Sequence, residues 1–270
     1  MVETTSPDFS NLSFRAGVMP ALFVGHGSPM NALEANEFSA TWATLGKVLP
    51  RPAAILCVSA HWLTRGTAIT TMERPQTIHD FWGFPPELHA FQYPAGGSPA
   101  WAKKIAGMMP GASVELDQHW GLDHGAWVVL ARMYPAADVP VLQLSIDQTR
   151  PAAYHYRLGQ ELAALRREGV LILGSGNIVH NLGRADFSIE SYEWAREFDV
   201  IMAEWIEQGQ HERILDYPAL GKLAHLAVPT NDHFLPLAYV IGAQDAEDRV
   251  AFSSERVVFG SISMRNVLLY

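Results

Sequence analysis

Residues 53–61 read AAILCVSAH, a run of apolar and small residues that ends in a histidine. A run of this length without polar alternation is typical of a strand buried on both faces, as in the middle of a parallel sheet. We therefore predict a strand over 53–60, with His61 directly after it. Similar apolar runs predict further strands at 21–25, 139–145, 170–174 and 256–261.

Longer segments with helical periodicity lie between these strands. They predict helices at 37–45, 99–108, 125–134, 151–168 and 191–208. Strands that alternate with helices are typical of βα units around a parallel sheet. The expected fold class is therefore α/β, a single domain over residues 19–270 with a mostly parallel central sheet flanked by helices. Residues 1–18 are polar and aperiodic and are expected to form a flexible leader, and the closing residues 261–270 are expected to add an edge strand.

The composition excludes several classes of function. Hydrophobic residues make up 49% of the 270 residues and charged residues 17%, so the chain has enough apolar material for a folded core. The formal net charge of -9 disfavours binding to nucleic acid and to anionic membranes. Cys57 is the only cysteine, which rules out a disulfide within the chain and a thiolate zinc site. We expect a cytoplasmic protein, a monomer or homodimer, that acts on a small molecule.

Residues 71–98 do not fit the alternation of strands and helices. They are rich in Pro and Gly and carry several aromatic residues, among them Phe81, Trp82, Phe84 and Tyr93. Long loops are uncommon inside a compact domain and usually shape a binding site. These four side chains are expected either to form an apolar wall of such a site or to belong to the core.

Two histidines directly follow predicted strands. His26 comes after 21–25, between glycines that allow a sharp turn, and His61 comes after 53–60. Ligand sites of open α/β sheets lie beyond the carboxyl ends of the strands. One such histidine alone fits a structural role equally well, but two at equivalent positions favour a metal site at these strand ends.

Three further histidines extend this arrangement. His180 follows the strand at 170–174 through a Gly-Ser-Gly segment, and His233 lies in a turn between two prolines. His124 stands at an expected helix start, where Asp123 suits a helix cap. A structural role remains an alternative for His124.

Six segments, in this order along the chain, resemble a known family. They are PALFVGHGSPMNAL at 20–33, SAHWLTRG at 59–66, IHDFWGFPPELHAFQYPA at 78–95, GLDHGAWVVL at 121–130, GSGNIVHNL at 174–182 and PTNDHFLPL at 229–237. The family is the 4,5-DOPA extradiol dioxygenases, which belong to the class III ring-cleaving dioxygenases. The resemblance implies insertion of O2 into a catechol such as L-DOPA at a mononuclear non-haem metal site.

The resemblance also implies a role for each histidine. His26, His61 and His233 would bind one divalent metal per chain, Fe(II) for dioxygenase activity or Zn(II) as in similar bacterial proteins. His180 would be a fourth ligand or the acid/base, and His124 would be the histidine on the substrate side, a second candidate for proton transfer. Three imidazoles in place of the usual two histidines and one carboxylate also suit zinc. A zinc-dependent hydrolase and a non-catalytic metal-binding protein on the same fold therefore stay open as alternatives.

Overall fold

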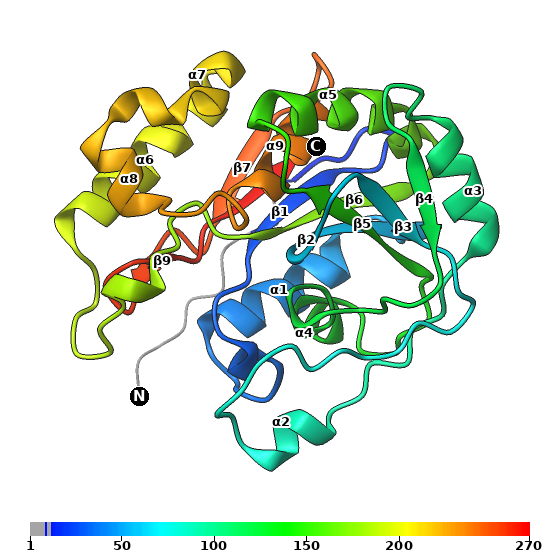
Figure 1. Ribbon diagram of the computed structural model, residues 1–270, viewed down its shortest axis with the longest axis horizontal. Helices are drawn as coiled ribbons and strands as arrows, with labels where there is room; N and C mark the ends of the chain where they lie inside the picture. The colour runs from blue at the N-terminus through cyan, green and yellow to red at the C-terminus, as the bar shows by residue number, and fades with distance from the viewer. Residues whose placement is uncertain (1–8, 10–11) are drawn as a thin grey trace.

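An eight-stranded sheet runs through the centre of the computed structural model, which describes residues 9 and 12–270 (Figure 1). The strand order is β4-β3-β5-β2-β6-β1-β10-β7. The strands are β1 Ala21–Gly25, β2 Ala54–Thr64, β3 Thr67–Thr70, β4 Val114–Asp117, β5 Val141–Asp147, β6 Val170–Gly176, β7 Val250–Ser253 and β10 Asn266–Leu269. Neighbours among β5, β2, β6 and β1 pair in parallel, whereas β3 joins β5, β10 joins β1 and β7 joins β10 in antiparallel fashion. The predicted single α/β domain with a mostly parallel sheet is confirmed.

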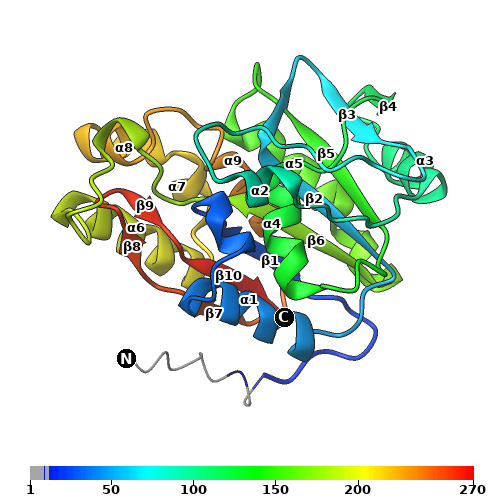
Figure 2. The same ribbon diagram turned by 90° about the horizontal axis from the view of Figure 1, so that it is seen from below.

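Helices cover both faces of this sheet, as the two views show (Figures 1 and 2). The helices are α1 Glu37–Val48, α2 Pro86–Ala90, α3 Pro99–Gly107, α4 His124–Met133, α5 Ala152–Leu162, α6 Glu193–Glu207, α7 His211–Leu215, α8 Lys222–Ala227 and α9 Leu235–Gly242. Successive side chains of a strand point to opposite faces. Leu56 and Val58 of β2 therefore join the core beneath α5 and α9, whereas Ile55 and Cys57 join the core beneath α1 and α4. Within the described residues, no helix combines the length and the apolarity needed to span a membrane.

The central strands agree with the sequence predictions, but two details differ. β1 has the predicted bounds, whereas β2 continues to Thr64, so His61 lies inside this strand and not after it. The pairing of β2 with β5 shifts register between Val58 and Leu63. Such an irregularity re-aims the side chains near it, which explains how an in-strand histidine still points into a site at the strand ends.

The prediction for the end of the chain was wrong in part. The strand expected at 256–261 is a short hairpin outside the main sheet, made of β8 Val257–Val258 and β9 Ile262–Ser263. Phe259 and Gly260, with φ of 50° and 77°, form its turn, and this backbone conformation does not fit a strand. The closing segment does add a strand, β10, but it lies between β1 and β7 and not at the edge.

Part of the predicted flexible leader contacts the fold. Of residues 1–18, residues 1–8, 10 and 11 lie outside the described residues. Phe14 packs edge-on against Tyr270, with 5.9 Å between ring centroids, and Arg15 lies 3.3 Å from a carboxylate oxygen of Asp248. The described residues 12–18 form neither helix nor strand, yet these contacts tie them to the residue after β10 and to the segment before β7.

Candidate metal centre

The five histidines singled out in the sequence come together at the carboxyl ends of the parallel strands. His26 follows β1, His61 lies in the outer part of β2, and His180 comes soon after β6. His124 is the first residue of α4, and His233 lies just before α9. The chain reaches this edge of the sheet five times, each time with an imidazole.

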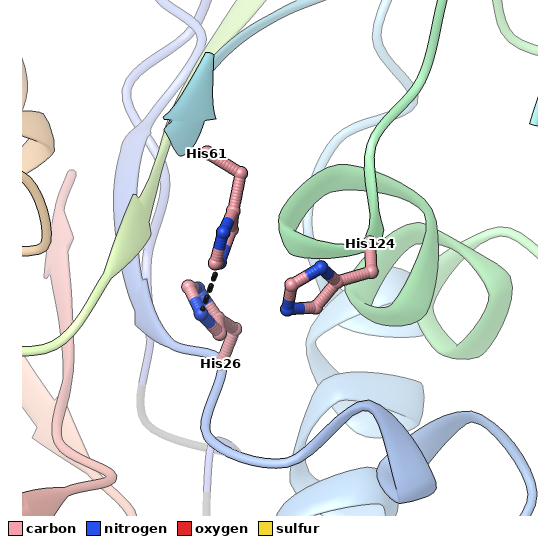
Figure 3. A group of neighbouring side chains, drawn as sticks. All are labelled: His26, His61 and His124. Carbon is pink, nitrogen blue, oxygen red and sulfur yellow. Dashed lines mark hydrogen bonds between the residues drawn. The ribbon is translucent and has the colours of Figure 1, made fainter. Parts of the chain in front are cut away.

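Three of these rings are arranged almost symmetrically. The ring centroids of His26, His61 and His233 lie 5.0, 5.0 and 5.2 Å from one another. The Nε2 atoms of His26 and His61 lie 3.1 Å apart, tip to tip (Figure 3). With metal–nitrogen bonds of about 2.0–2.1 Å, two imidazole nitrogens on one ion are about 3.0–3.4 Å apart. The spacing of His26 and His61 therefore fits two ligands of a single ion.

The other two histidines lie beside this trio. The ring of His124 is 3.9 Å from that of His61, and one nitrogen from each of His26, His61 and His124 falls within 4.8 Å of the others (Figure 3). The ring of His180 stacks on that of His233, with centroids 3.4 Å apart and planes inclined by 8°. His180, His233 and the neighbouring Asp232 form a second compact group of candidate ligands.

Hydrogen bonds fix the tautomer of His26. Its Nδ1 lies 3.0 Å from Oγ of Ser175, and the hydroxyl of Ser175 donates to the carbonyl oxygen of Gly125 at 2.5 Å. Because the only hydroxyl hydrogen is used in that bond, Ser175 accepts from Nδ1–H of His26. The Nε2 lone pair of His26 therefore faces the other histidines, as a metal ligand requires.

A carboxylate has the same effect on His233. Nδ1 of His233 donates to Asp232 at 2.5 Å, which leaves its Nε2 free to accept. Burial alone would raise the pKa of Asp232, but the hydrogen bond from His233 and the attraction to that ring outweigh it and lower the pKa. Asp232 is therefore ionised at neutral pH and orients the ring of His233.

Burial keeps His26, His61 and His180 uncharged. It lowers the pKa of His26 and of His61 well below the usual value for histidine, and nearby histidines lower it further. Burial and the neighbouring His233 also lower the pKa of His180, to about 3. Neutral imidazole is the form that binds metal, so no proton must be displaced from these rings near neutral pH.

Comparison with known proteins identifies the family. Residues 21–270 match the family model described as the catalytic LigB subunit of aromatic ring-opening dioxygenase. The chain belongs to this family.

Two curated relatives and one solved structure support the assignment to the ring-opening dioxygenases. The 4,5-DOPA dioxygenase extradiol of Escherichia coli K12 is 49% identical over 257 residues, 92% of this chain and 94% of the relative. The protein of the same name from Beta vulgaris is 39% identical and covers 84% of this chain and 87% of its own length. The crystal structure of an uncharacterized protein from Escherichia coli K12 matches with a TM-score of 0.80 and 42% identity, covering 93% of this chain and 100% of that one. The family predicted from the six sequence segments is confirmed.

Asp80 is a residue of this ring-opening dioxygenase that the sequence analysis missed. Its Oδ1 accepts the backbone N–H of His124 at 3.0 Å and lies 3.0 Å from Nδ1 of the same residue. Its Oδ2 lies 3.6 Å from Nδ1 of His61. Burial would raise the pKa of Asp80, but the contacts with His124 lower it overall, so this carboxylate is ionised beside two of the histidines. Asp80 lies in the segment IHDFWGF of the unusual loop 71–98, and this position could have identified it as a candidate site residue.

The dioxygenase cavity above the histidines has a volume of about 360 Å³, in the range of small-molecule sites. Phe81 and Phe84 line it, as expected of the aromatic wall. Trp82 and Tyr93 do not: Trp82 is 86% exposed, and Tyr93 is buried elsewhere with its hydroxyl bonded to the carbonyl of Tyr134 at 3.0 Å. Half of the predicted wall is therefore correct.

Replacing Ser175 with alanine is expected to weaken metal binding by about 10–100-fold, because Nδ1 of His26 loses the acceptor that orients the ring. Competition with a chromophoric chelator for Zn²⁺ measures this change. Ser145→Ala is the matched control, since Ser145 is also a fully buried serine of the sheet and its hydroxyl bonds to Thr64 and Ala68, away from the histidines. Equal affinities in the two variants would show that Ser175 has no role in orienting His26.

Proposed function

We propose that the chain is an extradiol dioxygenase that opens the ring of a catechol, such as L-DOPA, at one divalent ion held by His26, His61 and His233. The near-symmetric arrangement of these three rings, 5.0–5.2 Å apart, is the observation that carries the proposal. Three ligands leave positions open for the two oxygens of a catechol and for O2. When bound, the ion supplies a Lewis acid and a route for electrons from the ring to O2.

The donor set fits such an ion. Nδ1 of His26 donates to Ser175 and Nδ1 of His233 donates to Asp232, so both rings present a lone pair on Nε2. The ligands are neutral, which suits Fe(II) for the dioxygenase reaction and Zn(II) equally. We assign Fe(II) to the active form because ring opening uses O2.

His180 is proposed as the acid/base and not as a fourth ligand. Its ring is nearly parallel to that of His233, at 3.4 Å, so the lone pairs of the two rings lie in separate parallel planes and cannot both point at one ion. Burial and His233 lower the pKa of His180 to about 3, so the ring is neutral at pH 7 and has a free lone pair. A bound ion would make the catechol more acidic, and His180 would then take up its phenolic proton. The imidazolium that results can return this proton when the ring opens.

His124 is proposed to act on the substrate side of the same cavity. Its ring lies 5.6 Å from that of Phe81, a wall residue, and 3.9 Å from that of His61. The carboxylate of Asp80 lies 3.0 Å from its Nδ1, so a proton taken up by His124 would be stabilised there. Phe81 and Phe84 exclude water from the face of the bound ring.

Oxygen uptake tests the proposed function. Protein loaded anaerobically with Fe(II) and then mixed with L-DOPA or plain catechol should consume one O2 per ring opened, with both oxygen atoms appearing in the product. Zn(II)-loaded protein is the control and should bind catechol without using O2. If the Fe(II) protein consumes no O2 with any catechol, the proposal fails. Ester or amide hydrolysis by the Zn(II) protein would then favour the zinc hydrolase, for which a three-histidine site also suffices.

A further inference from the structure

Gln143 is a fully buried polar residue of β5 that does not line the cavity. Its side chain lies on the face of the sheet that α4 covers, as does that of Val141 two residues earlier. Its Oε1 accepts the backbone N–H of Asp123 at 2.8 Å, and its Nε2 donates to Oδ2 of Asp123 at 2.6 Å. Both ends of the amide group therefore bind one residue, and together they fix its backbone and its side chain.

Asp123 is itself fully buried, directly before α4. Its Oδ1 accepts the hydroxyl of Ser59 at 2.6 Å and the backbone N–H of Ala126 at 3.2 Å, the second of which caps the helix. Oδ2 accepts the amide of Gln143. A buried carboxylate that is bound at both oxygens has little freedom to turn, so the first turn of α4 is fixed relative to β2 and β5.

The same contacts set the distance between His124 and His61. His124 is the first residue of α4, and its ring centroid lies 3.9 Å from that of His61 (Figure 3). Ser59 also accepts the backbone N–H of His61, at 3.3 Å. A Cβ built on Gly125 would lie 2.4 Å from Oγ of Ser59 and 3.0 Å from Cδ2 of His61, so α4 approaches β2 as closely as a glycine allows. A small shift of this turn would change how the two rings face each other.

We propose that Gln143 is a positioning residue that acts through Asp123 and holds the ring of His124 in place beside the catechol. This inference rests on the proposed function, in which His124 acts on the substrate side. Loss of the amide removes the donor of Oδ2 and the acceptor of the backbone N–H of Asp123. Asp123 then turns toward its remaining donors and carries the first turn of α4 with it. A misplacement of about 1 Å in a site can lower a rate by about 10²-fold.

A double-mutant cycle tests whether Gln143 acts through His124. Gln143→Leu removes both hydrogen-bonding groups, and kcat/KM of the Fe(II) protein with catechol should fall by about tenfold to 100-fold. In a protein that already carries His124→Ala, the same replacement should change kcat/KM by less than about twofold, because the residue that it positions is gone. Metal content should stay native throughout. An equal fall in both backgrounds, a native rate in Gln143→Leu, or loss of its metal would overturn the proposal.

Catechol binding to the Zn(II) protein provides the same cycle without turnover. Calorimetry should show weaker binding in Gln143→Leu than in the native protein, and no further weakening when this replacement is added to His124→Ala. If the Fe(II) protein opens no ring but the binding cycle shows this pattern, the proposed function is wrong and the positioning role stands. If rings are opened but the two replacements act independently on rate and on binding, the positioning role is wrong and the dioxygenase assignment stands.

Asn266→Leu is the matched control for the loss of a buried amide. Asn266 lies on β10, is 1% exposed and donates to Oγ of Ser253 at 3.0 Å, with β6 and β1 between its strand and β2. The variant should have a lower thermal midpoint, as Gln143→Leu should, but a native kcat/KM. If Asn266→Leu were as slow as Gln143→Leu, the rate would follow stability and not the position of His124, and the proposal would fail.

An exchange of polarity tests the proposal even if Gln143→Leu does not fold. Gln143→Glu sets a second carboxylate against that of Asp123 and should impair the enzyme. Adding Asp123→Asn restores every bond, because the introduced amide donates where Oδ2 accepted and the introduced carboxylate still accepts the backbone N–H. Asparagine also keeps the helix cap. The double variant should recover kcat/KM to within about threefold of native, and a folded double variant with native metal that stays below this range would contradict the proposal.

Discussion

Replacing His61 with alanine is expected to abolish the binding of stoichiometric divalent metal. Nε2 of His61 lies 3.1 Å from Nε2 of His26, a spacing that fits two ligands of one ion. Without it, two imidazoles remain, fewer than the three protein ligands of catalytic zinc sites. The loss of affinity should therefore exceed the factor of about 10–100 that follows when only an orienting partner of a ligand is removed. Elemental analysis of the purified variant, followed by chelator competition, measures it.

Two controls make this result specific. His119→Ala removes an exposed histidine from the loop before α4 and should leave metal content unchanged. The side chain of His61 is 20% exposed and lies at the cavity and not in the core, so the metal-free variant should keep the thermal midpoint of the metal-free native protein. Native metal content in a folded His61→Ala protein would overturn the ligand assignment.

The strand ends made most of the centre predictable. His26, His61 and His180 each stand at the carboxyl end of an apolar run, and parallel strands bring their carboxyl ends to one edge of the sheet. The apolar runs also predicted the four central strands, because strands buried on both faces need uninterrupted apolar residues. The shorter strands β3, β4 and β7 have only four residues each and were missed, because four residues carry too little periodicity to be recognised.

The orienting groups could not be predicted in the same way. Ser175 contacts His26 across 149 positions of the chain, and Asp80 reaches His124 from the loop 71–98. Such pairs depend on how closely separate elements approach, and no local pattern records that distance. Gly176 is an example of such a close approach. A Cβ built on it would lie 2.1 Å from the carbonyl oxygen of His233, so only glycine allows β6 to pack this closely on the turn that carries His233.

Function was predictable at the level of family and less so at the level of substrate. The six segments named the family because they contain the histidines and their neighbours. The rim of the cavity, in contrast, combines Leu182, Phe187 and Phe259 with Phe84 of a distant loop. Which side chains meet at this rim becomes visible only once the fold has placed these residues together.

His180→Ala is expected to lower kcat by about 10²–10⁴-fold at neutral pH while metal content stays native. The ring that it removes is stacked on His233 and directed into the cavity, and it is the proposed acceptor of the phenolic proton. A fourth ligand would behave differently, because its loss would lower metal affinity as well. Steady-state kinetics and elemental analysis of the same preparation therefore separate the two roles.

The pH profile gives the sharper reading of this variant. Burial and the neighbouring His233 lower the pKa of His180 to about 3, so its neutral, proton-accepting form dominates at every pH above that value. In the native enzyme this base should therefore not be lost as the pH falls from about 7 to about 5, in contrast to a histidine with the ordinary value of about 6.5. In His180→Ala the rate should instead rise with pH toward the ionisation of the catechol itself, since the substrate then arrives without the proton that His180 would remove.

His225→Ala, which changes an exposed histidine of α8, should keep the native profile. A His180→Ala enzyme with native metal content, native rate and a native pH profile would show that the proton is taken by another group, and His124 beside Asp80 would then be the residue to test.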